Sequence, residues 1–248
     1  MADNRIRLLP LGFTRLFRKG LGKLLRIITY PIGFLLAMLA SDRIVMSVMR
    51  RLRTRRKRDL TTRGKRLASN SHAIMGRVGR ISLNEGFIED QQNYHAIPFG
   101  SSNAAASGCG AIAVYNCLDP AVRTPSRFAE ILDRLENGGT VLDGKLGTDI
   151  TSMRELLDEM GMSTRMLRFR DKTNDGLAKA IVLVMNNRYN IFDGMHYIVL
   201  EKRPSGYWIH NGTGMKAMGP FPDYRTAVRK SGTRKVRPIA MLEVDRAL

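Results

Sequence analysis

Cysteine is one of the residues that this sequence most lacks. Only Cys109 and Cys117 occur in 248 residues, eight positions apart in a segment that we expect to be helical. Two turns of helix separate the Cα atoms by about 12 Å, whereas a disulfide needs about 4.4–6.8 Å. We therefore expect no disulfide, which makes the chain compatible with a reducing cytosol.

Histidine is also scarce. The chain has four histidines, and neither a C-x-x-C nor an H-x-x-x-H spacing is present. Such spacings are typical of zinc sites. We therefore expect no structural metal, and nothing in the sequence calls for a cofactor.

Acidic residues are nearly missing from the first third of the chain. Residues 1–80 contain 20 Lys and Arg against 3 Asp and Glu, whereas residues 81–248 contain 21 against 19. The net charge of +19 therefore belongs almost wholly to the N-terminal third, and the remainder reads as a near-neutral globular domain. This split argues against a protein that binds nucleic acid throughout its length.

Long uncharged runs are few as well. In the N-terminal third the main one, Ile27 to Ser41, is about 15 residues or roughly 22 Å as a helix, short of the ~30 Å hydrocarbon core. Extending it to Met49 would place Asp42 and Arg43 inside the membrane. Residues 6–26 mix apolar and basic residues at helical spacing, as in helices that lie in a membrane interface. Monotopic or re-entrant insertion is favoured, with a single span and a soluble helix left open.

A basic cluster follows this apolar stretch, from Arg50 to Arg58. Such clusters mark the cytoplasmic side of membrane segments and attract anionic lipid. We expect residues 1–58 to be a basic, helical, membrane-associating segment that contacts an anionic membrane surface through residues 5–58. A polar basic linker over 59–82 and a cytoplasmic domain over 83–248 would follow. Binding of nucleic-acid phosphates is a weaker alternative, because no aromatic residues are interleaved with the basic ones.

The domain shows helical periodicity first and strand periodicity afterwards, which predicts an α+β fold with segregated halves. The run Ile181 to Met185 predicts a strand that is buried on both faces. Expected helices cover residues 107–118, 126–136, 148–160, 175–179 and 223–230, and expected strands cover residues 164–169, 181–185, 196–202, 207–210 and 238–244.

Cys109 lies between two glycines where an expected helix begins. The N-terminus of a helix stabilises a thiolate and lowers its pKa, and its free N–H groups can donate to an oxyanion. Gly108 and Gly110 would leave room for a substrate carbonyl to approach the sulfur. These features point to a cysteine nucleophile, while Cys117 reads as a core residue.

His196 and Asn211 lie on two strands joined by a turn at Pro204-Ser205. The simplest hairpin pairs residue 196 with about 213 and residue 198 with about 211. A slip of one residue would bring 196 opposite 211, about 4.5–5.5 Å apart at Cβ, so that the amide could orient the imidazole. Cys109, His196 and Asn211 would then form a Cys-His-Asn set. His210 points to the opposite face and reads as a surface or structural residue.

The runs CGAIAVYN at 109–116 and HYIVL at 196–200, followed by an asparagine that ends the next strand, resemble a known family. They are similar to the bacterial papain-like cysteine peptidases related to the bacteriocin-leader (double-glycine) peptidases, over roughly residues 88–245. The resemblance implies a papain-like fold, with Cys109 as nucleophile, His196 as general base and acid, and Asn211 as the residue that orients it. The family places an oxyanion-hole glutamine about six residues before the cysteine, where this chain has Asn103.

Together these observations predict a membrane-associated thiol hydrolase, most simply a cysteine peptidase that acts on a peptide or protein. Acyl transfer and deamidation use the same chemistry with other acceptors or leaving groups. A catalytically weak or inactive papain-like domain that binds a peptide or protein partner at the membrane is the first alternative. Nucleic-acid binding through the basic arm is the second.

Overall fold

The computed structural model describes residues 42–53, 62–77, 86–170, 176–189, 194–212, 217–232 and 235–246. Within these ranges the fold is α+β, as predicted, with helices that precede a six-stranded antiparallel sheet of order β3-β8-β4-β5-β6-β7. The helices are α2 Asp42–Arg51, α3 Thr62–Met75, α4 Ala104–Ser107, α5 Cys109–Cys117, α6 Pro125–Glu136, α7 Ile150–Glu159 and α8 Tyr224–Lys230, with 3₁₀ turns η2 Gln91–Tyr94 and η3 Pro120–Val122. The strands are β1 Pro98–Phe99, β2 Ser102–Asn103, β3 Met162–Leu167, β4 Lys179–Met185, β5 Met195–Arg203, β6 Gly206–His210, β7 Met218–Phe221 and β8 Arg237–Arg246.

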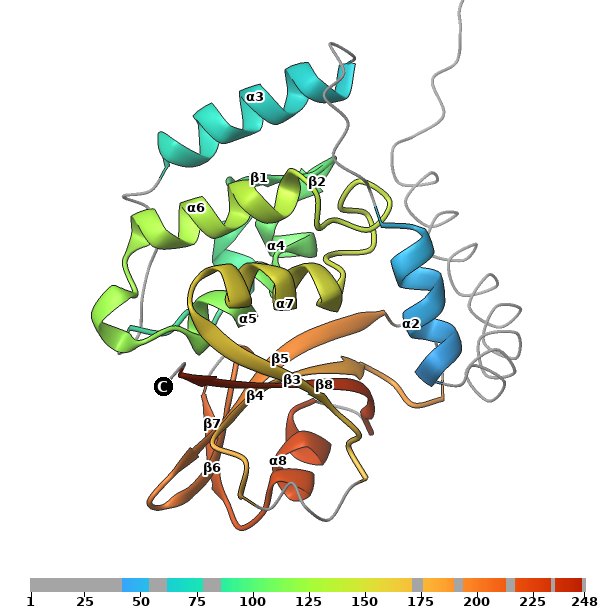
Figure 1. Cartoon of the computed structure of the whole chain (residues 1–248), viewed down its shortest axis with the longest axis vertical. Helices are drawn as coiled ribbons and strands as arrows, with labels where there is room; N and C mark the ends of the chain where they lie inside the picture. The colour runs from blue at the N-terminus through green and yellow to red at the C-terminus, as the bar shows by residue number, and fades with distance from the viewer. Residues whose placement is uncertain are drawn as a thin grey trace, which may run out of the picture.

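Helices cover both faces of the sheet. Helices α5 and α7 lie over one face and α8 lies against the other (Figure 1). In β4, Ile181 and Leu183 join the core beneath α5, whereas Val182 and Val184 join the core beneath α8. Successive side chains of a strand point to opposite faces, so the run 181–185 is buried on both faces, as its composition predicts.

One predicted helix and several strand details differ from the structure. Lys179 opens β4 and pairs with Glu201, so the short helix predicted over 175–179 does not extend to residue 179. Strand β7 and the β1–β2 hairpin were not predicted, because each has fewer than five residues and too little alternation to detect.

Helices α2 and α3 pack onto the domain. Val45 and Met49 of α2 and Ile74 of α3 are buried and belong to the same hydrophobic core as the apolar residues of α5. Asp42 forms an ion pair with Arg237 of β8 at 2.8 Å, and Asn70 donates to the carbonyl of Gly100 at 3.0 Å. The packed domain thus includes residues well before 83, the predicted boundary, because the apolar sides of these two helices find partners that the local sequence does not reveal.

The predicted membrane-associating segment falls mainly on residues 1–41, which lie outside the described residues. Across the described ranges, no helix is both long and apolar enough to cross a bilayer.

Candidate thiol site

Cys109 is the first residue of α5, at a break that separates α5 from α4. The helical segment starts earlier than predicted, since Asn103 caps α4 and the Gly108 N–H donates to the carbonyl of Ala104 at 2.9 Å. Cys109 therefore lies at an internal junction between two helices.

The glycines that flank Cys109 serve packing. A Cβ at Gly108 would lie 2.5 Å from the carbonyl oxygen of Ala104, and one at Gly110 would lie 2.7 Å from Cβ of Thr148. Real Cβ atoms do not approach other atoms so closely. Instead of leaving room for a substrate, the missing side chains let α4 and the loop before α7 contact the cysteine turn.

Burial decides the protonation state of the thiol. Cys109 is 7% exposed, and burial raises its pKa above the ordinary value. The backbone N–H groups of Tyr197, Gly110 and Cys109 itself point to the sulfur and act in the opposite direction, but they do not outweigh burial. The N–H groups at the helix start thus lower the pKa as predicted, but the net shift is upward because desolvation is the larger effect.

Strand β5 brings the histidine segment to the sulfur. The N–H that points to the sulfur belongs to the peptide joining His196 to Tyr197. Tyr197 lies beyond Val199 and His210, the last pair of the β5–β6 ladder. Its backbone N–H and carbonyl therefore do not bond to β6. Its carbonyl accepts from Nδ2 of Asn211 at 3.3 Å.

His196 contacts Asn211 in a way that differs from the prediction. The hairpin keeps the simplest register, Val199 with His210, and the slip that would pair 196 with 211 does not occur. Asn211 instead leaves the strand with φ of 54°, and its backbone carbonyl lies 2.6 Å from Nε2 of His196. The backbone of Asn211, and not its side-chain amide, thus contacts the imidazole.

This contact selects a tautomer. A carbonyl oxygen can only accept, so Nε2 of His196 carries the proton and Nδ1 keeps its lone pair. Burial lowers the pKa of His196, against the opposing effect of the Asn211 carbonyl, so the ring is held neutral. A neutral imidazole with a lone pair on Nδ1 has the protonation state of a general base.

Asn103 lies at the end of the β1–β2 hairpin, six residues before the cysteine. Its side-chain oxygen accepts from the Ala106 N–H at 2.9 Å as the cap of α4. The helix cap uses the side-chain oxygen of Asn103 as an acceptor, so the side chain can donate a hydrogen bond only through its amide nitrogen Nδ2.

A buried charged cluster borders the site, and the sequence analysis missed it. His210 is 1% exposed and stacks on Phe87, with ring centroids 3.8 Å apart. Its Nδ1 lies 2.5 Å from Glu89 Oε1, and Glu89 Oε2 accepts from the Asn211 N–H at 2.9 Å. His210 is therefore structural and not on the surface. The sequence places Glu89 after Phe87 and Ile88 and before polar residues, and nothing in it linked Glu89 to His210 and Asn211, 121 and 122 positions away.

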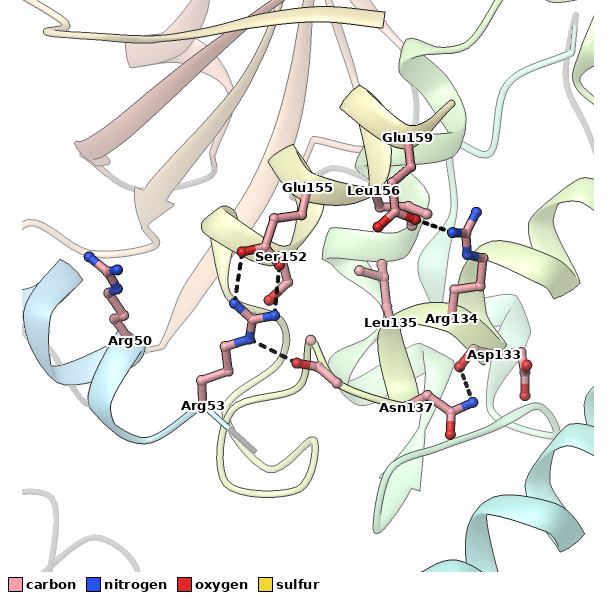
Figure 2. Close-up of a pocket in the computed structure, with 12 residues that line it drawn as sticks. Arg50, Arg53, Asp133, Arg134, Leu135, Asn137, Ser152, Glu155, Leu156 and Glu159 are labelled. Carbon is pink, nitrogen blue, oxygen red and sulfur yellow. Dashed lines mark hydrogen bonds and ion pairs between the residues drawn. The ribbon is translucent and has the colours of Figure 1, made fainter. Parts of the chain in front are cut away.

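A separate cavity of about 610 Å³ lies among α2, α6 and α7, and none of the four predicted site residues lines it (Figure 2). Arg53 donates to both carboxylate oxygens of Glu155, at 3.2 and 2.7 Å, and Arg134 pairs with Glu159. These ion pairs join the residue that closely follows α2 to α7, and α6 to α7 (Figure 2).

Both cysteines are free and buried, and Cys117 is a core residue as predicted. The described part of the chain holds no cluster of three or more His, Cys, Asp or Glu that could bind a metal ion. No protein-family model, curated protein or solved structure matches this chain.

Proposed function

We propose that this chain is a papain-like thiol hydrolase, most simply a cysteine peptidase, with Cys109 as nucleophile and His196 as general base. The observation that carries the proposal is the approach of the His196–Tyr197 peptide to the Cys109 sulfur, together with the contact between the Asn211 carbonyl and the His196 ring. The cysteine turn, the His196–Tyr197 peptide and the Asn211 carbonyl lie within one chain of contacts.

The chemistry follows from the protonation states. Nδ1 of His196 takes the proton of the Cys109 thiol as the sulfur attacks the substrate carbonyl carbon. The resulting oxyanion accepts hydrogen bonds from the Cys109 N–H and from Nδ2 of Asn103, the residue that takes the position of the family's glutamine. His196 then gives the proton to the leaving amine, and the thioester is hydrolysed by water that His196 deprotonates. An ammonia leaving group would make the same cycle a deamidation, and another acceptor would make it an acyl transfer.

The test is a labelling experiment on the full chain. Iodoacetamide and a short peptide chloromethyl ketone are offered to the parent, to Cys109→Ala and to His196→Ala. Labelling of Cys109 that falls about 10²-fold or more in His196→Ala supports the proposal, since a general base contributes about 10²–10⁴-fold. Equal labelling of Cys109 with and without His196 rejects it.

A second candidate is a domain of the same fold that binds a peptide or protein partner without turnover. The observation that favours it is the burial of Cys109, which raises the pKa of the thiol. Retention of a peptide ligand by both the parent and Cys109→Ala, with no product and no His196-dependent labelling, would select this candidate.

We further propose that the basic arm holds the domain at an anionic membrane, with the domain on the cytoplasmic side. The described end of this arm supports it. Ile44 and Val48 of α2 and Leu52, the residue after it, are exposed at 54%, 46% and 37% and are spaced four residues apart. Arg50 and Arg51 are exposed beside them, and apolar side chains flanked by arginine suit an interface of anionic lipid.

Vesicle flotation tests this part. The full chain should float with phosphatidylglycerol vesicles and should float less with neutral phosphatidylcholine vesicles, and Val48→Glu should weaken flotation. Retention on a nucleic acid that is lost steeply with salt, without flotation, would instead favour binding of phosphates.

A further inference from the structure

Glu89 is a buried carboxylate whose two oxygens are both engaged. It is 7% exposed, and it lies just before η2, on the N-terminal side of the cysteine helix. Oε1 contacts Nδ1 of His210 at 2.5 Å, and Oε2 accepts from the Asn211 N–H at 2.9 Å. A carboxylate is stable at such burial only with partners of this kind. The contacts tie the start of the domain to the end of β6.

Asn211 adopts an unusual conformation that two hydrogen bonds hold in place. Its φ of 54° lies in the left-handed region, which asparagine enters more readily than most residues with a side chain but less readily than glycine. The backbone N–H is held by Glu89, and Nδ2 of the side chain donates to the carbonyl of Tyr197. In this conformation the Asn211 carbonyl meets Nε2 of His196.

We propose that Glu89 is a positioning residue of the thiol site, which holds the Asn211 amide so that the Asn211 carbonyl stays on Nε2 of His196. Glu89 thereby keeps the proton on Nε2 and leaves Nδ1 as the nitrogen that takes the proton of Cys109. The consequence for reactivity rests on the proposed function, whereas the consequence for the His196 tautomer does not.

The charges around Glu89 define a matched control. Nε2 of His210 contacts Glu201 at 3.2 Å, so the imidazole lies between two carboxylates. Burial opposes charge on His210, but its hydrogen bonds to Glu201 and Glu89 prevail and raise its pKa. Glu201 therefore shares the His210 contact with Glu89 but is not the acceptor of the Asn211 amide. The other charged groups that face this cluster are Arg203 on β5, Lys179 on β4 and Arg123 after η3.

The experiment compares Glu89→Gln with Glu201→Gln in the full chain, with Cys117→Ala in every protein so that Cys109 is the only thiol. Spectra of ¹⁵N-labelled histidine report the His196 tautomer, and iodoacetamide alkylation between about pH 5 and 10 reports Cys109. In the parent, His196 should carry its proton on Nε2. Glu89→Gln should populate the other tautomer and slow alkylation at neutral pH about 10-fold, as loss of a contact that orients an imidazole typically does. Glu201→Gln should keep the parent tautomer and should not show this slowing of about 10-fold.

An unchanged His196 tautomer in both Glu89→Gln and Glu89→Asp overturns the proposal. Both variants are needed, because a glutamine oxygen can still accept from the Asn211 N–H. The proposal is also overturned if Glu89→Gln and Glu201→Gln change the His196 tautomer and the alkylation rate equally, in proportion to their loss of thermal stability. If Glu89→Gln does not fold, Glu89→Asp replaces it, because its carboxylate is one methylene too short to span His210 and Asn211. An unshifted His196 spectrum in Glu89→Asp then overturns the proposal by itself.

Different results would reject the proposed thiol chemistry and the positioning role of Glu89. If His196→Ala leaves Cys109 as reactive as the parent, the proposed thiol chemistry is wrong. The ¹⁵N spectra of Glu89→Gln, Glu89→Asp and Glu201→Gln still decide whether Glu89 positions His196.

Discussion

The carbonyl oxygen of Asn211 lies 2.6 Å from Nε2 of His196, although the two residues are not opposite each other in the β5–β6 hairpin. The left-handed turn at Asn211 makes the contact, because it redirects the backbone as the strand ends. The contact with His196 therefore depends on the backbone conformation of residue 211, whereas its side-chain amide donates to the Tyr197 carbonyl.

Substitutions at Asn211 distinguish the effect of its backbone conformation from the effect of its side-chain amide. Glycine adopts φ near 54° without strain, whereas alanine there costs about 1–2 kcal/mol. Asn211→Gly should therefore unfold at higher urea than Asn211→Ala and alkylate Cys109 faster. Unfolding by urea and iodoacetamide kinetics measure both. If glycine and alanine impair the site equally, the lost side chain and not the backbone orients His196.

The pH dependence of Cys109 reactivity should show a neutral resting pair. Burial raises the pKa of Cys109 and lowers that of His196, so neither group is charged at neutral pH. The alkylation rate should rise with pH through a midpoint above the ordinary thiol pKa of about 8.5, and Cys109→Ser provides the blank. A rate that is already at a plateau near pH 5 would mean a thiolate–imidazolium pair and would contradict this assignment.

Glu136 should make stability fall as pH rises toward neutrality. Burial raises its pKa to about 7, against a hydrogen bond from Asn70. A carboxyl whose folded pKa is raised stabilises the fold fully below its unfolded pKa of about 4.3, and this contribution is lost as pH rises through the folded value. Glu136→Gln should therefore flatten the dependence of the unfolding free energy on pH between about 5 and 7.

Glu201→Gln is the control for that experiment, because its expected effect has the opposite sign. Burial opposes its charge, but hydrogen bonds from His210 and Arg203 hold the pKa of Glu201 at about 2. The stability it contributes is present above its unfolded pKa and is lost as pH falls toward 2. Urea titrations at several pH values would contradict both assignments if the two variants changed the same pH range.

Helix α2 should behave as part of the packed domain. Met49 is 4% exposed in the core, whereas Val48 beside it is 46% exposed. Met49→Ala should lower the unfolding free energy by about 2–5 kcal/mol, and Val48→Ala should change it by no more than about 0.5 kcal/mol. Denaturant unfolding provides both values. Two equally small effects would mean that α2 does not stabilise the domain.

Much of the fold could be predicted because its signals are local. The apolar stripe of 126–136 and the run Ile181 to Met185 carry helix and strand periodicity within a dozen residues. Their order along the chain was enough for the α+β class. The packing of α2 and α3 could not be predicted, since a basic, weakly patterned segment gives no sign of the surface that it will meet.

The candidate site was predictable by residue type and not by contact. Glycines around Cys109 suggested a reactive turn, but the structure uses them for close packing against Ala104 and Thr148. The pKa of Cys109 depends on how many atoms exclude water from the sulfur, and that is a property of the folded domain.

The sequence alone determined the concentration of positive charge in the first 80 residues, the α+β order and the choice of Cys109, His196 and Asn211 as the residues to compare. Only the tertiary structure decided that Asn211 contacts His196 through its carbonyl and that Glu89 holds the Asn211 amide. Composition and periodicity act over a few residues, whereas these contacts join positions 15 and 122 residues apart and exist only when the sheet and its preceding segment have packed together.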